Sequence, residues 1–255
     1  MVPIFELEDV SLSYELAGGA RNVLRNISFT VSDGEILTFC GASGTGKTSL
    51  LRIMAGLTRQ TGGTANFRGA PIDGPANDVA IVFQDYSNAL LQWRTVGRNV
   101  ALGIERTLKG TELKDRVMDA LRLVGLEKNV NDYPWQLSGG MQQRVQIARA
   151  LALKPSVLLM DEPFAALDAM TKASLQDELL NIRDKTGANI VFITHDIEEA
   201  VYLGDRVAVL RGTPSTVEQL FDIALPKPRN QITTRELPEF LALRHRIHDA
   251  IGGHS

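Results

Sequence analysis

The chain has 255 residues, of which 44% are hydrophobic and 22% are charged, and its formal net charge is −3. This size fits one α/β domain with a sizeable core, and the composition is that of an ordinary globular protein. The chain has no excess of basic residues, which argues against nucleic acid as the main partner. Cys40 is the single cysteine, which excludes an intramolecular disulfide framework and favours a reducing compartment.

The sequence contains no obvious membrane segment. No run approaches the roughly 18 consecutive apolar residues that a membrane-spanning helix needs. The first residues also lack the basic-then-apolar order of a secretory signal. If the protein works at a membrane, we expect another chain to supply the membrane spans.

Strands and helices are expected to alternate along most of the chain. The N-terminal part predicts strands over residues 5–13, 23–31 and 35–40, a turn at Asp33-Gly34, a helix over residues 47–57 that ends before Thr61-Gly62-Gly63, and a strand over residues 79–84. Residues 85–153 are mostly helical in pattern, with Ser138 as an N-cap and Pro155 as the end of the helical part. A strand over residues 157–160, a helix over 171–185 closed by Gly187, a strand over 189–194, a helix over 196–203 and a strand over 206–210 follow.

This alternation implies a mainly parallel sheet that is covered on both faces. After Arg211 the pattern weakens, and only a short amphipathic helix over about residues 237–251 is expected.

A complete phosphate-binding loop of the form G-x-x-x-x-G-K-[ST] stands between the third strand and the first helix. It consists of Gly41, Ala42, Ser43, Gly44, Thr45, Gly46, Lys47 and Thr48, and Ser49 follows it. Glycines allow backbone N–H groups to approach phosphate oxygens, and the N-terminus of the next helix favours negative charge. We expect Lys47 to reach the β- and γ-phosphates of ATP and the Thr48 hydroxyl to bind Mg²⁺.

Two acidic residues, Asp161 and Glu162, follow the apolar strand over residues 157–160. Ligands bind at the carboxyl ends of strands in open α/β sheets. Beside a phosphate-binding loop, Asp161 is therefore expected to hold Mg²⁺ through water, and Glu162 to act as the general base that polarises the attacking water.

A second helix N-terminus that suits an anion begins at Ser138, Gly139 and Gly140, in the segment Leu137-Ser138-Gly139-Gly140-Met141-Gln142-Gln143-Arg144. Two such termini are unexpected in a chain with one phosphate-binding loop. The segment lies between that loop and the two acids, and with them it resembles the signature of the ATP-binding cassette (ABC) ATPases. The resemblance runs from about Phe5 to about Leu210.

The resemblance implies a P-loop NTPase core with a mainly parallel sheet, an antiparallel β subdomain and a helical subdomain. We expect a single domain over residues 1–255, with the core in 1–84 and 155–212, the helical subdomain in 85–154 and a short extension in 213–255. It also implies a head-to-tail homodimer or paired cassette, in which two ATP molecules lie between the phosphate-binding loop of one subunit and Ser138–Gly140 of the other.

Further site residues follow from the family pattern. His195 matches the histidine that contacts the γ-phosphate, and Gln84 matches the glutamine that senses the γ-phosphate and Mg²⁺. Asp168 matches the segment that crosses the dimer interface, and Tyr14 fits the aromatic residue on which adenine stacks. Gln142 continues the signature segment and is expected to take part in nucleotide binding.

Several short segments resemble those of the nitrate/sulfonate/taurine family of importer ATPases. Two of them are Leu90-Leu91-Gln92-Trp93-Arg94-Thr95-Val96 and Thr194-His195-Asp196. That family often has proline at Gln92 and glycine at Ala165. The resemblance implies membrane permease subunits as partners, a solute-binding protein as an indirect partner, and a peripheral place on the cytoplasmic face of the membrane. Trp93 would lie near the groove for the membrane subunit, although a buried packing role is an alternative.

Three other functions stay open. The chain could be a soluble ABC ATPase outside transport, a regulatory module that holds ATP without cleaving it, or a phosphate-loop kinase. The interval between Lys47 and Ser138 leaves no room for the long coiled coil of chromosome-maintenance relatives. His245, His248 and His254 are expected to be solvated, with no metal assigned to them.

Overall fold

The computed structural model describes residues 2–16, 19–84, 89–165 and 167–252. The chain forms two compact units: unit 1 comprises residues 1–76 and 189–255, and unit 2 comprises residues 77–188. The predicted division into core, helical subdomain and extension stays a prediction.

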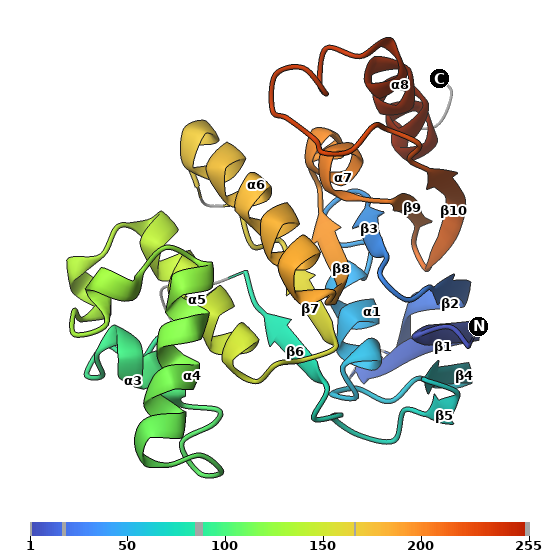
Figure 1. Cartoon of the computed structure of the whole chain (residues 1–255). Helices are drawn as coiled ribbons and strands as arrows, with labels where there is room; N and C mark the ends of the chain where they lie inside the picture. Colours follow the sequence, from blue (N-terminus) through green and yellow to red (C-terminus); the bar gives the residue numbers. More distant parts are fainter. Residues whose placement is uncertain (1, 17–18, 85–88, 166, 253–255) are drawn as a thin grey trace. The chain divides into compact units, whose positions relative to one another are not determined.

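Unit 1 is a mixed sheet with helices on it (Figure 1). Its elements are β1 (Phe5–Leu16), β2 (Gly19–Val31), β3 (Ile36–Cys40), α1 (Lys47–Met54), β4 (Gly62–Phe67), β5 (Ala70–Pro71), β8 (Asn189–Thr194), α7 (Ile197–Leu203), β9 (Arg206–Gly212), β10 (Ser215–Asp222) and α8 (Pro238–Gly252). Its strands lie in the order β5-β4-β1-β2-β10-β9-β3-β8. The antiparallel strands at one side and the parallel strands at the other agree with the expected α/β architecture.

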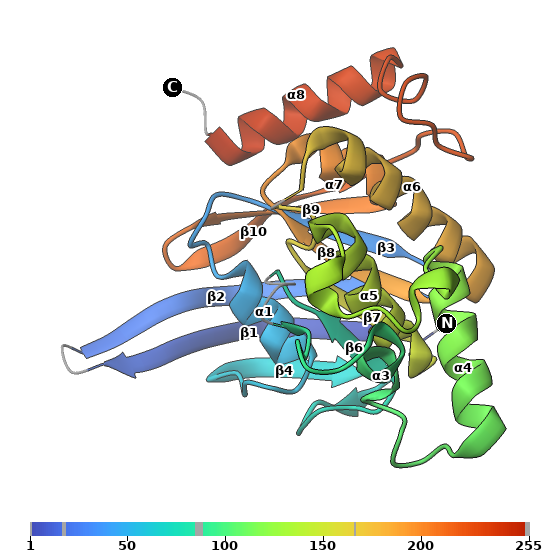
Figure 2. The same cartoon turned by 90° about the vertical axis from the view of Figure 1, so that its left-hand side faces the viewer.

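A long antiparallel hairpin of β1 and β2 begins the chain, and Figure 2 shows its length beside β4. The structure extends both strands beyond the predicted bounds, with pairs from Phe5↔Val31 to Leu16↔Gly19. The outer end carries exposed side chains such as Arg21, so periodicity could not reveal it. Cross-strand hydrogen bonds, rather than burial, define those residues as strand.

The core of unit 1 surrounds β3, whose five residues are all buried. β3 pairs in parallel with β8 on one side and with β9 on the other. All six residues of β8 are buried as well. Such continuous apolar runs are typical of parallel strands that are covered on both faces, and each fully buried Ile or Phe contributes about 1.5–3 kcal/mol.

Besides the two-residue strand β5, two longer strands of unit 1 were missed in the sequence. β4 begins at Gly62, within the tripeptide interpreted only as a helix end, and pairs antiparallel with β1. β10 pairs antiparallel with β9 although Glu218 and Gln219 are exposed. In both cases the partner strand supplies the hydrogen bonds that weak local patterns did not predict.

Unit 2 holds a short parallel pair of strands and several helices. Its elements are β6 (Val79–Val82), α3 (Val96–Ala101), α4 (Gly110–Leu123), two 3₁₀ turns (Glu127–Asn129 and Pro134–Gln136), α5 (Gly139–Ala152), β7 (Val157–Asp161) and α6 (Ala169–Thr186). β6 and β7 run parallel, in the register Val82↔Met160.

Local signals fixed the helix ends of unit 2. Ser138 is the N-cap of α5, as predicted, and α5 ends at Ala152 before Pro155. Gly187 closes α6 in a left-handed conformation with φ of 67°. In the described part of the chain, no helix combines the length and the apolarity needed to cross a bilayer. Those same residues contain no cluster of His, Cys, Asp and Glu side chains that could hold a metal ion by itself.

Cys40, at the end of β3, gives a test of this core. Burial raises the pKa of its thiol from 9.0 to about 12, against the opposing effects of Lys47 and the Gly41 N–H. A buried thiol is unreactive, so iodoacetamide at pH 8.5 should modify the folded chain at least about 100-fold more slowly than the denatured chain, as measured by mass spectrometry.

The same shift has a consequence for stability. Above pH 9 the unfolded chain loses the Cys40 proton while the folded chain keeps it, so this group's contribution to stability should fall as pH rises from 9 towards 12. Cys40→Ala should remove that part of the pH dependence. Equal labelling rates in the folded and denatured chain would contradict the buried position of Cys40.

Candidate functional site

The phosphate-binding loop of unit 1 connects β3 to α1. Gly44 and Gly46 have φ of 82° and 80°, in the left-handed region that favours glycine. A Cβ on Gly46 would lie 2.7 Å from Val23 Cγ1 and 2.9 Å from Leu24 Cδ2. Gly46 is therefore required by packing against β2, in addition to the access for phosphates that the sequence suggested.

Lys47 lies along this loop with only 5% of its surface exposed. Its Nζ donates to the carbonyl oxygens of Gly41 at 2.8 Å and Ala42 at 2.9 Å. Ala42, Ser43 and Gly44 are exposed. An accessible loop backbone above a buried cation, at the N-terminus of a helix, fits a chain of phosphate groups.

The remaining predicted residues of that loop divide between structural and exposed roles. Thr45 is buried, and its Oγ1 donates to the Ala42 carbonyl at 2.9 Å. Thr48 is exposed on the first turn of α1, while Ser49 is half-buried.

His195 and Tyr14 belong to the same unit as the loop. Cys40 pairs with Thr194, so the loop and His195 leave neighbouring strands at one edge of the sheet, and His195 is exposed. Tyr14 is 36% exposed, and its Oη lies 3.4 Å from Ser49 Oγ on α1. Unit 1 thus groups these side chains around the loop, and stacking of adenine on Tyr14 stays a prediction.

In unit 2, Asp161 is the last residue of β7 and Glu162 follows it, while Gln84 lies two residues after β6, the strand paired with β7. Asp161 is 6% exposed, Glu162 is half-buried and Gln84 is exposed. Glu162 has φ of 43°, a conformation that is uncommon for a residue with a side chain and is concentrated at functional positions. Sequence patterns gave no sign of this backbone geometry.

The signature segment forms the first turn of α5. Ser138 Oγ accepts a hydrogen bond from the Met141 N–H at 3.4 Å. Gln142 is directed to the preceding loop, where its Nε2 donates to the carbonyl oxygens of Pro134 at 3.0 Å and Leu137 at 3.2 Å. These bonds hold the segment that leads into the helix, and a contact of Gln142 with nucleotide stays a prediction.

Thr171 connects the signature segment to Asp168, a link that the sequence did not reveal. Its Oγ1 donates to Asp168 Oδ2 at 2.6 Å, and a Cβ on Gly140 would lie 2.4 Å from Thr171 Cγ2. Asp168 also caps α6 by accepting from the Met170 and Thr171 N–H groups. The hydrogen bonds from Thr171 are the main cause that lowers the pKa of the exposed Asp168 carboxyl. Its place at a dimer interface stays a prediction.

An open groove of about 480 Å³ lies beside these residues, with Ser138, Gly140, Met141, Arg144, Met170 and Thr171 in its lining. Arg144 is held there by Glu178 at 3.1 Å. Burial raises the pKa of Glu178, and the charge of Arg144 opposes that rise. The groove carries a fixed cation and the N-terminus of α5, so it suits an anionic group.

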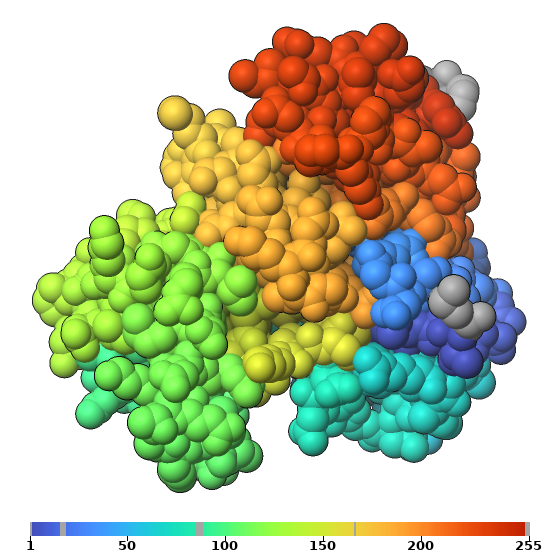
Figure 3. Space-filling model, in the orientation of Figure 1, coloured from blue at the N-terminus to red at the C-terminus, as the bar shows by residue number. Residues whose placement is uncertain are grey.

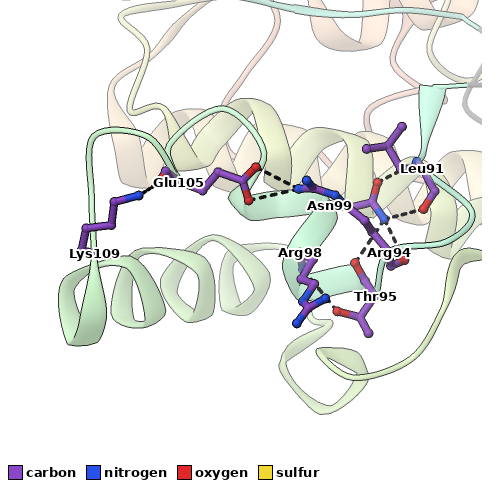
Figure 4. A network of polar contacts seen from close by, with 7 residues as sticks. All are labelled: Leu91, Arg94, Thr95, Arg98, Asn99, Glu105 and Lys109. Atoms are coloured by element: carbon purple, nitrogen blue, oxygen red, sulfur yellow. Dashed lines mark hydrogen bonds and ion pairs between the residues drawn. The ribbon is translucent and has the colours of Figure 1, made fainter.

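The Trp93 side chain of unit 2 is 75% exposed. This exposure excludes the alternative that Trp93 is a buried packing residue. Figure 4 shows a polar network of residues that flank Trp93 in sequence, among them Leu91, Arg94 and Asn99. The fully buried Asn99 accepts from the Leu91 N–H at 2.8 Å and donates to the carbonyl oxygens of Leu91, Arg94 and Thr95. Arg94 pairs with Glu105 at 3.0 Å through both carboxylate oxygens. The segment that presents Trp93 is therefore well ordered.

The contact of Gly140 with Thr171 predicts a pair of variants. Gly140→Ala should destabilise the chain by about 1–3 kcal/mol, because the new Cβ overlaps the Thr171 methyl group. Adding Thr171→Ser removes that methyl group but keeps the hydroxyl that Asp168 uses, so the double variant should recover most of the loss in urea unfolding. A double variant that is as unstable as Gly140→Ala alone would contradict this contact.

The chain matches known proteins over most of its length. The family profile of the ABC transporters matches residues 24–165. An uncharacterized ABC transporter ATP-binding protein of Methanocaldococcus jannaschii is 45% identical over 95% of this chain and 89% of its own length. The nitrate transport protein NasD of Klebsiella oxytoca is 40% identical over 97% of this chain and 95% of its own. The aliphatic sulfonates import ATP-binding protein SsuB of Bacillus subtilis is 42% identical over 90% and 87%.

Solved structures agree with these relatives. The cbiO1 protein of Clostridium perfringens, part of an ABC transporter complex, has a TM-score of 0.79 at 28% identity and covers 88% of this chain and 90% of its own. A dimeric ATP-binding cassette in a post-hydrolysis state with ADP and Pi has a TM-score of 0.76 at 30% identity over 86% and 98%. The chain belongs to the ABC transporter family and is an ATP-binding subunit of that family, an ATPase that uses ATP with Mg²⁺.

Proposed function

We propose that this ATPase is the energy-coupling subunit of an importer for a small anion or organic solute of the nitrate or sulfonate class. One observation carries the proposal: a nitrate transport protein and a sulfonate import protein align with the chain at 40% and 42% identity over 95% and 87% of their own lengths. In the proposed arrangement the solute does not contact this subunit, so other subunits select it.

Two copies of the chain, or one copy and a related cassette, close on two molecules of Mg-ATP. The dimeric relative with ADP and Pi supports this arrangement. In the proposal, each nucleotide lies between the phosphate-binding loop of one subunit and Ser138–Gly140 of the other. The second anion-binding helix N-terminus then binds a phosphate group of the nucleotide held by the other subunit. In a single subunit with one phosphate-binding loop, this second N-terminus would have no role.

Within unit 1, the loop residues bind the phosphates. Lys47 binds the β- and γ-phosphates, the Thr48 hydroxyl would hold Mg²⁺, Ser49 contributes to nucleotide binding, and Tyr14 supports the adenine ring. His195 contacts the γ-phosphate from the end of β8. These roles agree with the buried cation, the exposed loop backbone and the exposed His195.

Within unit 2, Asp161 holds Mg²⁺ through water and Gln84 senses the same cation and the γ-phosphate. Glu162 polarises the attacking water, and its left-handed backbone supports a position set by function rather than by local preference. Mg²⁺ supplies charge neutralisation on the phosphate oxygens.

Membrane permease subunits are the proposed direct partners, and a solute-binding protein is an indirect one. The chain then lies peripherally on the cytoplasmic face of the membrane. The exposed Trp93, on a segment ordered by the buried Asn99, supports a contact with such a partner, since exposed tryptophans are common anchors at interfaces.

Glu162→Gln tests the assignment of the base. The variant should retain ATP binding and lose about 10²–10⁴-fold in turnover, because the amide cannot accept the proton of the attacking water. It should also accumulate as a dimer with Mg-ATP in size-exclusion chromatography. Glu112→Gln, on the exposed first turn of α4, is the matched control and should hydrolyse ATP normally. Wild-type turnover in Glu162→Gln would refute the assignment.

A pull-down in mild detergent tests the transport partner. The tagged chain should recover a polytopic membrane protein from its native cells, identified by mass spectrometry, and Trp93→Ala should recover several-fold less of it. Ile232→Ala removes another exposed apolar side chain and should have no effect. Recovery of nucleic acid or assembly factors instead would favour a soluble ABC ATPase outside transport.

A further inference from the structure

Residues 226–252 form a tail that packs against α7. Phe240, Leu243 and Ile247 on α8 are buried, and α8 contacts α7 and β9 (Figures 1 and 3). Helix α7 begins two residues after His195. The tail therefore packs against the helix that starts directly beside a proposed γ-phosphate ligand.

Two arginines of the tail hold one carboxylate of α7. Arg235 Nη1 donates to Glu198 Oε2 at 2.7 Å, and Arg244 Nη1 donates to Glu198 Oε1 at 3.0 Å. Each pair is partly exposed, and a single pair of this kind adds little stability. A carboxylate whose two oxygens are bonded to two different guanidinium groups is nevertheless fixed in direction.

The guanidinium of Arg235 is itself fixed by its surroundings. It lies over the ring of Tyr202 at 5.1 Å and over that of Phe240 at 6.0 Å, and its Nε donates to Gln231 Oε1 at 3.1 Å. Tyr202 belongs to α7 and Phe240 to α8. Arg235 therefore joins the two helices through both charge and ring contacts.

The other end of α7 is held by the tail as well. Arg229, whose side chain is 2% exposed, donates to the Tyr202 carbonyl oxygen at 2.6 Å, a favourable contact at a helix C-terminus. Lys227 pairs with Asp205 at 2.6 Å, and Asp205 accepts from the Ile36 N–H at the start of β3. The tail thus ties α7 at both ends to the sheet of unit 1.

The start of α7 is rigidly connected to the backbone around His195. Thr194 Oγ1 donates to Glu199 Oε2 at 2.5 Å, and both residues are buried. Asp196 Oδ1 accepts from the N–H groups of Glu198 and Glu199, at 2.9 and 3.3 Å. A displacement of Glu198 would therefore also displace Thr194 and Asp196, the residues on either side of His195.

We propose that Arg235 and Arg244 are positioning residues for ATP hydrolysis: by holding Glu198 they fix α7, and through α7 the corner that presents His195. The proposal rests on the proposed role of His195. The tail acts on turnover more than on nucleotide affinity, because Arg235 and Arg244 bond to Glu198 on α7, whereas the phosphate-binding loop leads into α1.

The test is the variant Arg235→Gln/Arg244→Gln of the full chain. Its kcat for ATP should fall about 10-fold while the KM for ATP stays within about two-fold, since a small displacement of a reacting group lowers the rate without weakening binding. Arg246→Gln is the matched control: Arg246 lies on α8 with Arg244, but its guanidinium lies over the Phe221 ring at 5.2 Å. Its loss should leave kcat unchanged. Unchanged kcat in the double variant would overturn the proposal.

A second measurement separates positioning from a general loss of structure. The imidazole Cε1–Hε1 signal of His195, assigned by its absence in His195→Ala, should move in the nuclear magnetic resonance spectrum of Arg235→Gln/Arg244→Gln and of Glu198→Ala, and should stay in place in Arg246→Gln. A His195 signal that does not move in Arg235→Gln/Arg244→Gln and in Glu198→Ala overturns the proposal, whatever the turnover.

His195→Ala distinguishes failure of this inference from failure of the proposed function. In that background the two arginine substitutions should cause no further loss of turnover, because residues that act through one another are not additive. An equal further loss would show a purely structural role for the tail. Wild-type turnover in His195→Ala alone would instead refute the role of His195 on which the inference rests.

Discussion

The parallel pairing of buried strands is the constraint on which the proposed site depends. In unit 1, β3 is paired on both sides and its five residues are buried. Parallel strands share one carboxyl edge, so the register Cys40↔Thr194 makes the phosphate-binding loop and His195 begin at the same edge. In unit 2 the register Val82↔Met160 does the same for Gln84 and Asp161. Residues distant in sequence are grouped in each unit because the strands before them are aligned.

Close steric fits then set the details. Gly46 packs against the side chains of Val23 and Leu24 on β2, and Gly140 packs against the Thr171 side chain. At both glycines an added Cβ would lie less than 3.0 Å from these atoms. The glycines of both anion-binding segments are therefore needed by the protein's own packing as well as by the ligands that they are proposed to approach. Thr171 shows how such a contact also orders a neighbour, because the same side chain donates to Asp168.

The tail gives unit 1 a second kind of constraint, built from charge rather than from burial. Arg229 is buried against the end of α7, while Arg235 and Arg244 hold its start through Glu198. The individual ion pairs near the surface contribute little free energy, but together they restrict the direction of one short helix. A helix of seven residues has little stability of its own, so its neighbours determine its position.

The sequence by itself determined the motifs and most of the elements. The phosphate-binding loop, the signature segment and the two acids at the end of β7 are local patterns, and β8, α5, α6 and α7 follow from apolar runs and caps of each element. Tertiary structure alone decided β4, β10, the long ends of β1 and β2, the left-handed Glu162, and the contacts of Thr171 and of the tail arginines. These features depend on partners distant in the chain, whose hydrogen bonds, ring contacts and ion pairs leave no periodic signal in the residues that receive them.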